Sequence, residues 1–267
     1  MNDMSQSISR YRDIIYYRTL AGLKSESRQN YLGYIWFFLE PLLVTAILYF
    51  AFGHLFTQRG AEYVLIILLG MIMWQWFESS VFTAMLSIRQ KVGVLEHYKI
   101  PMFIFPFVNI AINTWKFLFV LLTVLLLALF VEVTGEHLNM PSLSWLALPF
   151  YLLLQLLLIL GVGMLLAVAV SYINDLVTLV SSMLRLLFFV SGVFFRLDRV
   201  PEHLQFAFLA NPMANFIECY RIVLLDGSLP PSGYTIYLTC LSVGLFMLGF
   251  FLCKSQEGKL LKCMIRE

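Results

Sequence analysis

The 267-residue chain is poor in charge: only 13% of its residues are Asp, Glu, Lys or Arg, whereas 60% are hydrophobic, and the mean hydropathy is +0.83. Soluble domains carry about 25% charged residues, so this scarcity excludes an ordinary soluble protein. The polar opening, MNDMSQSISRYRD, lacks the basic start and apolar core of a cleaved signal peptide. We therefore expect a polytopic membrane protein whose first spanning helix acts as the insertion signal.

Motifs for catalysis are also missing. The sequence contains no GxxxxGK[ST] phosphate-binding loop and no HExxH, GxSxG or SxxK, so we expect neither ATP hydrolysis nor another enzymatic activity from this chain. Its four cysteines form no CxxC pair and its four histidines are dispersed. This spacing predicts no metal site, no disulfide framework and no cofactor within the chain.

Long hydrophobic runs are abundant, and a spanning helix needs about 20 mostly apolar residues. Segments 1–32, 87–101 and 254–267 hold twelve of the Lys and Arg residues, against four in the other loops, so both termini are predicted to face the cytoplasm. The sequence predicts an all-α integral membrane protein, with a six-span domain over 33–253 and a cytoplasmic tail over 254–267. The predicted transmembrane helices are 33–56, 63–86, 103–131, 145–171, 177–195 and 234–253.

The segment before the first span, residues 1–32, predicts an amphipathic helix. Apolar or aromatic residues recur between Ile8 and Leu23, and basic side chains fall mostly between them. This pattern suits a helix that lies in the membrane interface. Such a helix could be a passive anchor, or it could receive an anionic lipid headgroup or a partner protein.

The loop 87–101 mixes charged side chains with apolar ones before Pro101. It is too long for a tight turn and too polar to be buried in lipid. Two interpretations stay open at this point. The loop is either a solvated connector or a short cytoplasmic helix that offers Leu95 and Tyr98 to a partner.

Two short helical runs, about 203–210 and 213–225, follow the fifth span and are separated by Asn211-Pro212. Each run is too short to span a membrane, so the pair is predicted to dip into the outer leaflet and return as a re-entrant element. Irregular backbone at that depth is tolerated where it lines a cavity. This element therefore favours a translocation path over a simple membrane anchor.

Glu40 and Pro41 are unexpected inside the first span, because a charge near the bilayer centre costs about 2.5–3.5 kcal/mol. Both become acceptable if that helix lines a dimer interface or a hydrated channel. Aromatic residues also cluster on the first and fifth spans, where they either pack helices and form interfacial belts or line a pore wide enough for sugar rings. These aromatics are Tyr34, Trp36, Phe37, Phe38, Tyr49 and Phe50, followed by Phe188, Phe189, Phe194 and Phe195.

Several motifs, taken in order, resemble one family. They are Leu32-Gly33-Tyr34-Ile35-Trp36, Leu39-Glu40-Pro41, Pro101, Pro106, Ser191-Gly192-Val193-Phe194-Phe195, Pro201, Asn211-Pro212, Glu218 and Arg221. On a six-span frame, and over nearly its whole length, the chain resembles the membrane subunit of ABC-2 type polysaccharide exporters, which move capsule, O-antigen or teichoic acid chains. It departs from many relatives at Gly192, where they have a proline that would kink the helix, although glycine also permits bending.

The resemblance implies a permease subunit of the bacterial inner membrane. It would export a lipid-linked polysaccharide from cytoplasm to periplasm, through a channel between two protomers. The implied partners are a second copy of the chain, two copies of a separate ATPase that binds ATP and Mg²⁺, the lipid-linked glycan and membrane lipid. No nucleic-acid partner is expected.

The resemblance also implies roles for individual residues. The loop 87–101 would couple to the ATPase through Val94, Leu95, Glu96, His97, Tyr98 and Lys99. The N-terminal helix would meet lipid headgroups through Arg10, Arg12, Arg18 and Arg28. The channel would be lined by Tyr34, Trp36, Phe37, Glu40, Pro41, Tyr49, Phe188 and Phe189. Periplasmic gate helices over 203–225 would act through Asn211, Pro212, Glu218 and Arg221.

Two alternatives remain beside this interpretation. One is an ABC-2 exporter of a small lipid or drug, which would need a narrower pore. The other is a membrane-bound enzyme or scaffold of the same glycan pathway. A neighbouring gene for an ATPase would favour either exporter over the enzyme or scaffold, because an exporter of this type requires an ATPase and an enzyme does not.

Overall fold

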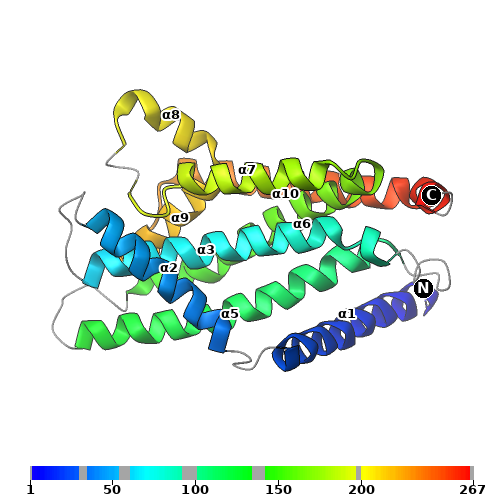
Figure 1. Cartoon of the computed structure of the whole chain (residues 1–267), viewed down its shortest axis with the longest axis horizontal. Coiled ribbons are helices and arrows are strands. Elements are labelled where there is room, and N and C mark those ends of the chain that lie inside the picture. The colour runs from blue at the N-terminus through cyan, green and yellow to red at the C-terminus, as the bar shows by residue number, and fades with distance from the viewer. Residues whose placement is uncertain are drawn as a thin grey trace.

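The computed structural model describes residues 2–29, 35–53, 61–91, 101–133, 142–196 and 200–264, and every regular element in these ranges is a helix. The long helices lie side by side, and the start of the first helix and the end of the last lie at the same end of the bundle (Figure 1). The elements are α1 (Asn2–Gln29), α2 (Ile35–Gly53), α3 (Ala61–Leu86), η1 (Arg89–Lys91), α5 (Ile104–Val133), η2 (Leu143–Ala147), α6 (Leu148–Tyr172), α7 (Leu176–Val190), α8 (Glu202–Ala210), α9 (Pro212–Leu224) and α10 (Ser232–Met264).

Four stretches of the described residues are long and apolar enough to cross a membrane. They coincide with the second, third, fourth and sixth predicted spans: Tyr63–Leu86, Ile104–Leu126, Leu143–Tyr172 and Ser232–Leu260. The first and fifth predicted spans correspond to α2 and α7, and α7 has only 15 residues. This is fewer than the roughly 20 that a perpendicular crossing needs, so a count of six complete crossings stays a prediction.

Helix α3 forms the centre of the fold. It packs against α2, α5, α6, α7 and α9, and nearly all of its apolar side chains are buried, including Ile67 and Trp74. A helix that is apolar on every side is expected to be enclosed by other helices or by lipid. Because α3 is enclosed by protein, any polar group that it carries must find a partner or a cavity inside the bundle.

Helices α6 and α10 form the most extensive helix contact in the described chain. Glycine permits it, because a Cβ atom on Gly161 would lie 2.5 Å from the carbonyl carbon of Leu245, and one on Gly249 would lie 2.6 Å from the carbonyl oxygen of Gly161. Small residues allow the backbones of membrane helices to approach closely in this way. The pair forms a rigid wall beside α3.

Helix α10 continues past residue 253, where the predicted span ended, and reaches Met264. Its extension contacts the rest of the bundle: the Met102 N–H donates to Glu257 Oε1 at 3.1 Å, and Tyr172 Oη donates to Gln256 Oε1 at 3.2 Å. Leu260 is fully buried. Most of the predicted tail is therefore a helical continuation that packs against the start of α5 and the end of α6.

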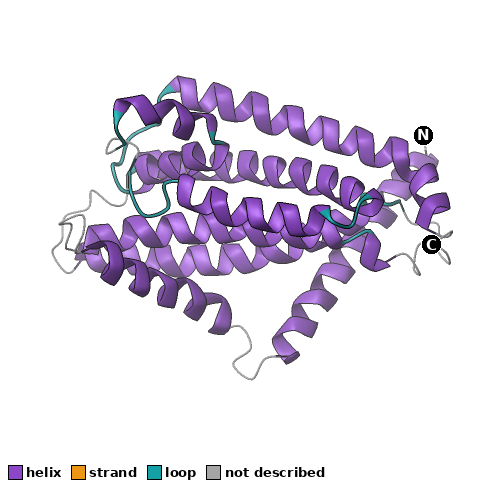
Figure 2. Cartoon of the chain, turned by 45° about the horizontal axis from the view of Figure 1, so that its top comes forward, coloured by secondary structure: helices purple, strands orange, loops and turns teal. Residues whose placement is uncertain are grey.

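Helix α1 runs beside the first turns of α5. Tyr11 makes an edge-on ring contact with Phe103, and a Cβ atom on Gly22 would meet the Ile112 side chain at 2.4 Å. In Figure 2 the axis of α1 is inclined to the long helices of the bundle. The predicted N-terminal helix is thus present, while its placement in the membrane interface stays a prediction.

Candidate functional site

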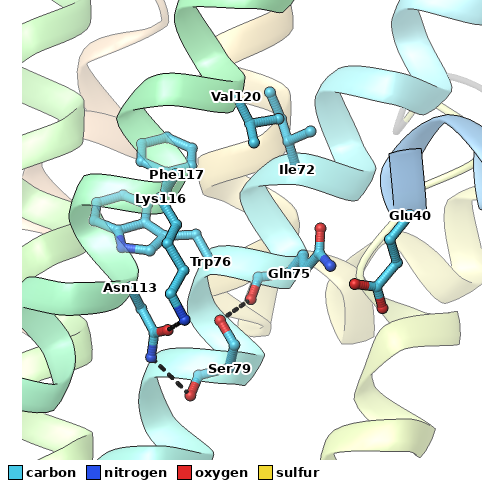
Figure 3. Close-up of a pocket in the computed structure, with 9 residues that line it drawn as sticks. All are labelled: Glu40, Ile72, Gln75, Trp76, Ser79, Asn113, Lys116, Phe117 and Val120. Atoms are coloured by element: carbon cyan, nitrogen blue, oxygen red, sulfur yellow. Dashed lines mark hydrogen bonds between the residues drawn. The ribbon is translucent and has the colours of Figure 1, made fainter. Parts of the chain in front are cut away.

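A polar pocket of about 180 Å³ lies between α2, α3 and α5 (Figure 3). Gln75 and Lys116 lie near the midpoints of the candidate spans Tyr63–Leu86 and Ile104–Leu126. An ionisable side chain at that depth costs about 2.5–3.5 kcal/mol and marks a functional site by default. The pocket is lined by Glu40, Ile72, Gln75, Trp76, Ser79, Asn113, Lys116, Phe117 and Val120.

A ladder of hydrogen bonds joins α3 and α5 at the pocket floor. Lys116 Nζ donates to Asn113 Oδ1 at 3.2 Å, and Asn113 Nδ2 donates to the Ser79 carbonyl at 3.2 Å and to Thr83 Oγ1 at 2.8 Å. One turn further, Asn109 Nδ2 donates to the Thr83 carbonyl at 2.9 Å. These bonds satisfy the amides of α5, so the asparagines hold the two helices together.

The polar lining extends beyond this pocket. A second cavity, of about 300 Å³, shares Asn113 with the first and reaches Gln90 beyond the end of α3. Together the two cavities follow the polar ladder along the α3–α5 contact. Polar groups therefore line this part of the bundle from the short helix η1 to the level of Glu40.

Two side chains at the pocket have unused hydrogen-bonding capacity. Within the described part of the chain, the Glu40 carboxylate and the Gln75 side-chain amide form no hydrogen bond or ion pair. Figure 3 shows Glu40 on α2 across the pocket from Gln75, while Lys116 extends toward Asn113. Glu40 and Lys116 carry opposite charges, so the pocket is close to neutral overall.

A second polar cluster holds the turn after α7 against α3 and α9. Arg221 is 1% exposed and donates to four backbone carbonyls. Its Nη1 reaches Gly192 at 2.9 Å and Phe195 at 2.8 Å, and its Nη2 reaches Ile66 at 3.0 Å and Val193 at 2.7 Å. The guanidinium therefore fastens three separate segments of the chain at one point.

Acidic side chains surround this guanidinium. Glu218 lies 3.7 Å from Arg221 and 3.6 Å from Arg196, and Arg196 also pairs with Asp226. Burial lowers the pKa of Arg221 to about 10, while the Glu218 carboxylate raises it. Arg221 thus stays charged at neutral pH, and its charge is compensated inside the protein.

The Asn211-Pro212 junction separates α8 from α9, as the sequence predicted. Asn211 Oδ1 accepts the Met213 N–H at 3.0 Å, which caps α9, and Asn211 Nδ2 donates to Ser191 Oγ at 2.9 Å. Gly192 has φ +65°, a conformation that proline cannot adopt. Gly192 therefore belongs to the turn that ends α7 and does not form a kink within a continuing helix.

The four residues predicted for a periplasmic gate are all close to this turn. Asn211, Glu218 and Arg221 are buried, and Pro212 begins α9. Helices α8 and α9 lie toward the end of the bundle opposite the two termini (Figure 1). The structure brings the predicted set together, while its role as a gate stays a prediction.

The residues predicted for a channel are only partly brought together. Trp36 and Phe189 are exposed, whereas Phe188 is half-buried and packs edge-on against Trp74 with ring centroids 5.8 Å apart. Tyr34 lies outside the described residues, as do the side chains of Phe37, Pro41 and Tyr49. Of the predicted set, only Glu40 lines the polar pocket.

The other two predicted sites are less fully described. In α1, Arg12 is exposed and pairs with Asp13 at 3.4 Å, and Arg18 is half-buried. The side chains of Arg10 and Arg28 lie outside the described residues, as do all the coupling residues Val94, Leu95, Glu96, His97, Tyr98 and Lys99. Both roles stay predictions.

Most of the pocket was not predicted from the sequence. A usable signal exists, because Gln75, Ser79 and Thr83 repeat every four residues, as do Asn109 and Asn113. Residues at that spacing share one face of a helix. Two such polar stripes on neighbouring spans predict that the two helices pack with their polar faces together.

Comparison with known proteins places the chain in a family. Residues 18–225 match the family described as ABC-2 type transporter. The chain is 27% identical to the O-antigen export system permease protein RfbA of Klebsiella pneumoniae over 81% of this chain and 82% of that protein. It is 25% identical to the protein of the same name from Myxococcus xanthus, over 89% and 90% of the two chains. It is 23% identical to the polysialic acid transport protein KpsM of Escherichia coli, over 86% and 88%. The resemblance noted in the sequence is confirmed: the chain belongs to the ABC-2 type transporter family, as a multi-pass protein of the bacterial inner membrane.

Proposed function

We propose that this chain is the permease subunit of an ATP-driven exporter that moves a lipid-linked polysaccharide across the inner membrane. The observation that carries the proposal is the match, over more than four-fifths of both chains, to proteins named for O-antigen export and polysialic acid transport. The chain has no phosphate-binding loop of its own. The energy would therefore come from a separate ATP-binding subunit.

The packing around the loop 87–101 supports a coupling role for it. Ser87 and Ile88, the first two residues of the loop, are buried, and so is Met102 directly after it. Ser87 Oγ donates to the Ala84 carbonyl at 2.6 Å, and the Met102 N–H is held by Glu257. A displacement of the loop by an ATPase would thus pass directly into α3 and α5, the helices that carry the polar pocket.

The exposed face of α2 supports pairing of two protomers. Trp36, Glu40, Leu43, Ile47 and Phe50 are all exposed and follow one another at spacings of four and three residues. That spacing is the seam of two helices packed side by side. A second copy of the chain would pack along this seam, and the translocation path would run between the two protomers.

Helix α8 would be the moving part of a periplasmic gate. It packs mainly against α9 and leaves Phe206 84% exposed, whereas α9 is buried along most of its length. Arg221 and Asn211 fasten α9 to the turn after α7. In this proposal α9 is the fixed frame, and α8 swings on the Asn211-Pro212 junction.

A complementation experiment tests the proposed function. Cells that lack this chain should lose surface polysaccharide and accumulate lipid-linked glycan in the cytoplasm, and the intact chain should restore export. In the complex purified with its ATPase, Leu95→Asp and Tyr98→Asp should lower ATPase activity stimulated by the glycan. Normal surface polysaccharide in cells without the chain would contradict the proposal.

A further inference from the structure

We propose that the pocket between α2, α3 and α5 binds one neutral, hydroxyl-rich sugar ring, with Glu40, Gln75 and Lys116 as its hydrogen-bonding groups. This inference rests on the proposed function, since it names a place where the transported glycan touches the chain. The pocket is built from one protomer. It would therefore act as a side site that each copy offers to the path between them.

The first support for this proposal is the depth of Gln75 and Lys116 within the candidate spans. Gln75 and Lys116 lie at the middle of two candidate spans, where polar side chains are costly and are kept for a purpose. The asparagines of the ladder serve packing, because each donates to α3. Gln75 and Glu40 have no such role, since neither side chain bonds to another described residue. Their unused capacity points to a ligand or to water.

The chemistry of the lining indicates the class of ligand. A carboxylate accepts hydrogen bonds, an ammonium donates them, and a primary amide does both. This mixture matches hydroxyl groups, each of which donates and accepts. A phosphate or diphosphate would gain from Lys116 but would be repelled by Glu40. The near-neutral pocket therefore favours an uncharged ring over an anionic lipid headgroup.

The size and walls of the pocket agree with this class. Its volume of about 180 Å³ is room for one ring and not for a folded chain. Trp76 and Phe117 stack on each other with centroids 4.1 Å apart and close one side. Together with Ile72 and Val120, these two rings line the pocket and give the C–H groups of a sugar ring an apolar surface.

Access to the pocket comes from the exposed face of α2. Glu40 lines the pocket and also belongs to the seam of exposed residues that includes Trp36 and Leu43. A glycan moving through the path between the two protomers, which this seam borders, would pass the pocket opening. Each ring could enter sideways, bind and leave, while the rest of the glycan stays in the path.

The test uses the full-length chain with its ATPase in lipid nanodiscs, and the probe is the lipid-linked glycan isolated from cells that lack the chain. Binding is followed by tryptophan fluorescence, and Trp76→Phe shows which part of the signal comes from the pocket. Glu40→Gln and Gln75→Leu should each weaken binding about tenfold or more, since a hydrogen bond to a charged or buried group is lost. Both should also slow export in cells.

Glu78→Gln is the matched control. Glu78 is a carboxylate on the same helix α3, it accepts the Trp74 indole N–H at 2.8 Å, and it does not line the pocket. Its replacement should leave glycan affinity unchanged. Equal affinity in wild type, Glu40→Gln and Gln75→Leu would overturn the pocket assignment while export by the wild type continues to support the proposed function.

Two further outcomes are decisive. Displacement of the glycan from the wild type, but not from Glu40→Gln, by millimolar inorganic pyrophosphate would overturn the neutral-ring assignment, because the pocket would then prefer an anion. Failure of the wild-type chain to export or bind any glycan would overturn the proposed function itself. Binding that is weakened by the pocket variants and insensitive to pyrophosphate supports the sugar site.

Discussion

Replacing Arg221 by Gln should destabilise the protein more than any other single polar change in the described chain. The substitution removes a buried guanidinium that donates to the carbonyls of Gly192, Val193, Phe195 and Ile66. Gln can reach at most a fraction of these acceptors. The other carbonyls would lose this donor, and the Glu218 carboxylate would lose the fully buried cation 3.7 Å away.

The magnitude follows from the cost of breaking a buried charge pair, about 3–5 kcal/mol. Single hydrogen bonds to charged groups contribute about 1.5–3 kcal/mol, but the four bonds share one guanidinium and their contributions are not additive. We therefore expect a loss of about 3–5 kcal/mol. For a domain of this size, 1 kcal/mol shifts Tm by about 2–4 °C, so the Tm should fall by roughly 10 °C.

The assay is thermal unfolding of the purified chain in detergent micelles, followed by the amount of monodisperse protein left after heating. Arg12→Gln is the control, because Arg12 is exposed and pairs with the likewise exposed, adjacent Asp13 at 3.4 Å. That variant should melt within about a degree of wild type, as exposed ion pairs contribute little. An Arg221→Gln protein as stable as Arg12→Gln would refute the reasoning that Arg221 is the fastening point.

Three further predictions use the same melting assay. Gly161→Ala should lower the free energy of unfolding by about 1–3 kcal/mol, because its Cβ atom would meet the α10 backbone at 2.5 Å. Gly244→Ala is the control and should be neutral or stabilising, since there is open space around Gly244. Equal effects of the two substitutions would contradict the close α6–α10 packing. Asn211→Ala should cost about 0.5–2 kcal/mol through loss of the α9 cap, and an unchanged Tm would show that the cap is dispensable. Leu260→Ala should lower the free energy of unfolding by about 2–5 kcal/mol, since the Leu260 side chain is fully buried. Leu248→Ala, on an exposed face of the same helix, should lower it clearly less. Similar losses for the two variants would contradict packing of the α10 extension.

Most of the helix positions could be predicted from the hydrophobic runs and from the prolines. The predicted spans 103–131 and 145–171 correspond closely to α5 and α6, and the Asn211-Pro212 break divides α8 from α9 as expected. Helix α10 continues past Cys253, where the sequence turns polar and the predicted span ends. A change of polarity marks the limit of the lipid-facing surface, but residues 254–264, with three Lys, two Leu, one Gln and one Glu, are mostly good helix formers, so the helix has little local reason to end there.

The polar sites were harder to predict, because their partners are distant in sequence. Arg221 was singled out through a resemblance, but its acceptor at Ile66 is 155 residues away. Glu40 was recognised as anomalous for its depth, while the side chains that share its pocket come from α3 and α5. Depth and charge can be judged from one helix alone. Which polar stripes meet depends on the rotation and register with which the helices pack.

The length of α10 has a mechanical consequence. Its 33 residues, at about 1.5 Å each, make one unbroken rod of about 50 Å, whereas the hydrocarbon core is about 30 Å thick. The rod is locked to α6 at Gly161 and Gly249, and its protruding end holds Met102 through Glu257. A displacement of residue 102 would therefore be transmitted to α10, a long continuous helix that packs closely against α6. A movement that begins at one surface of the bilayer could therefore pass along α10 to the other surface, because the helix has no break at which the movement would be lost.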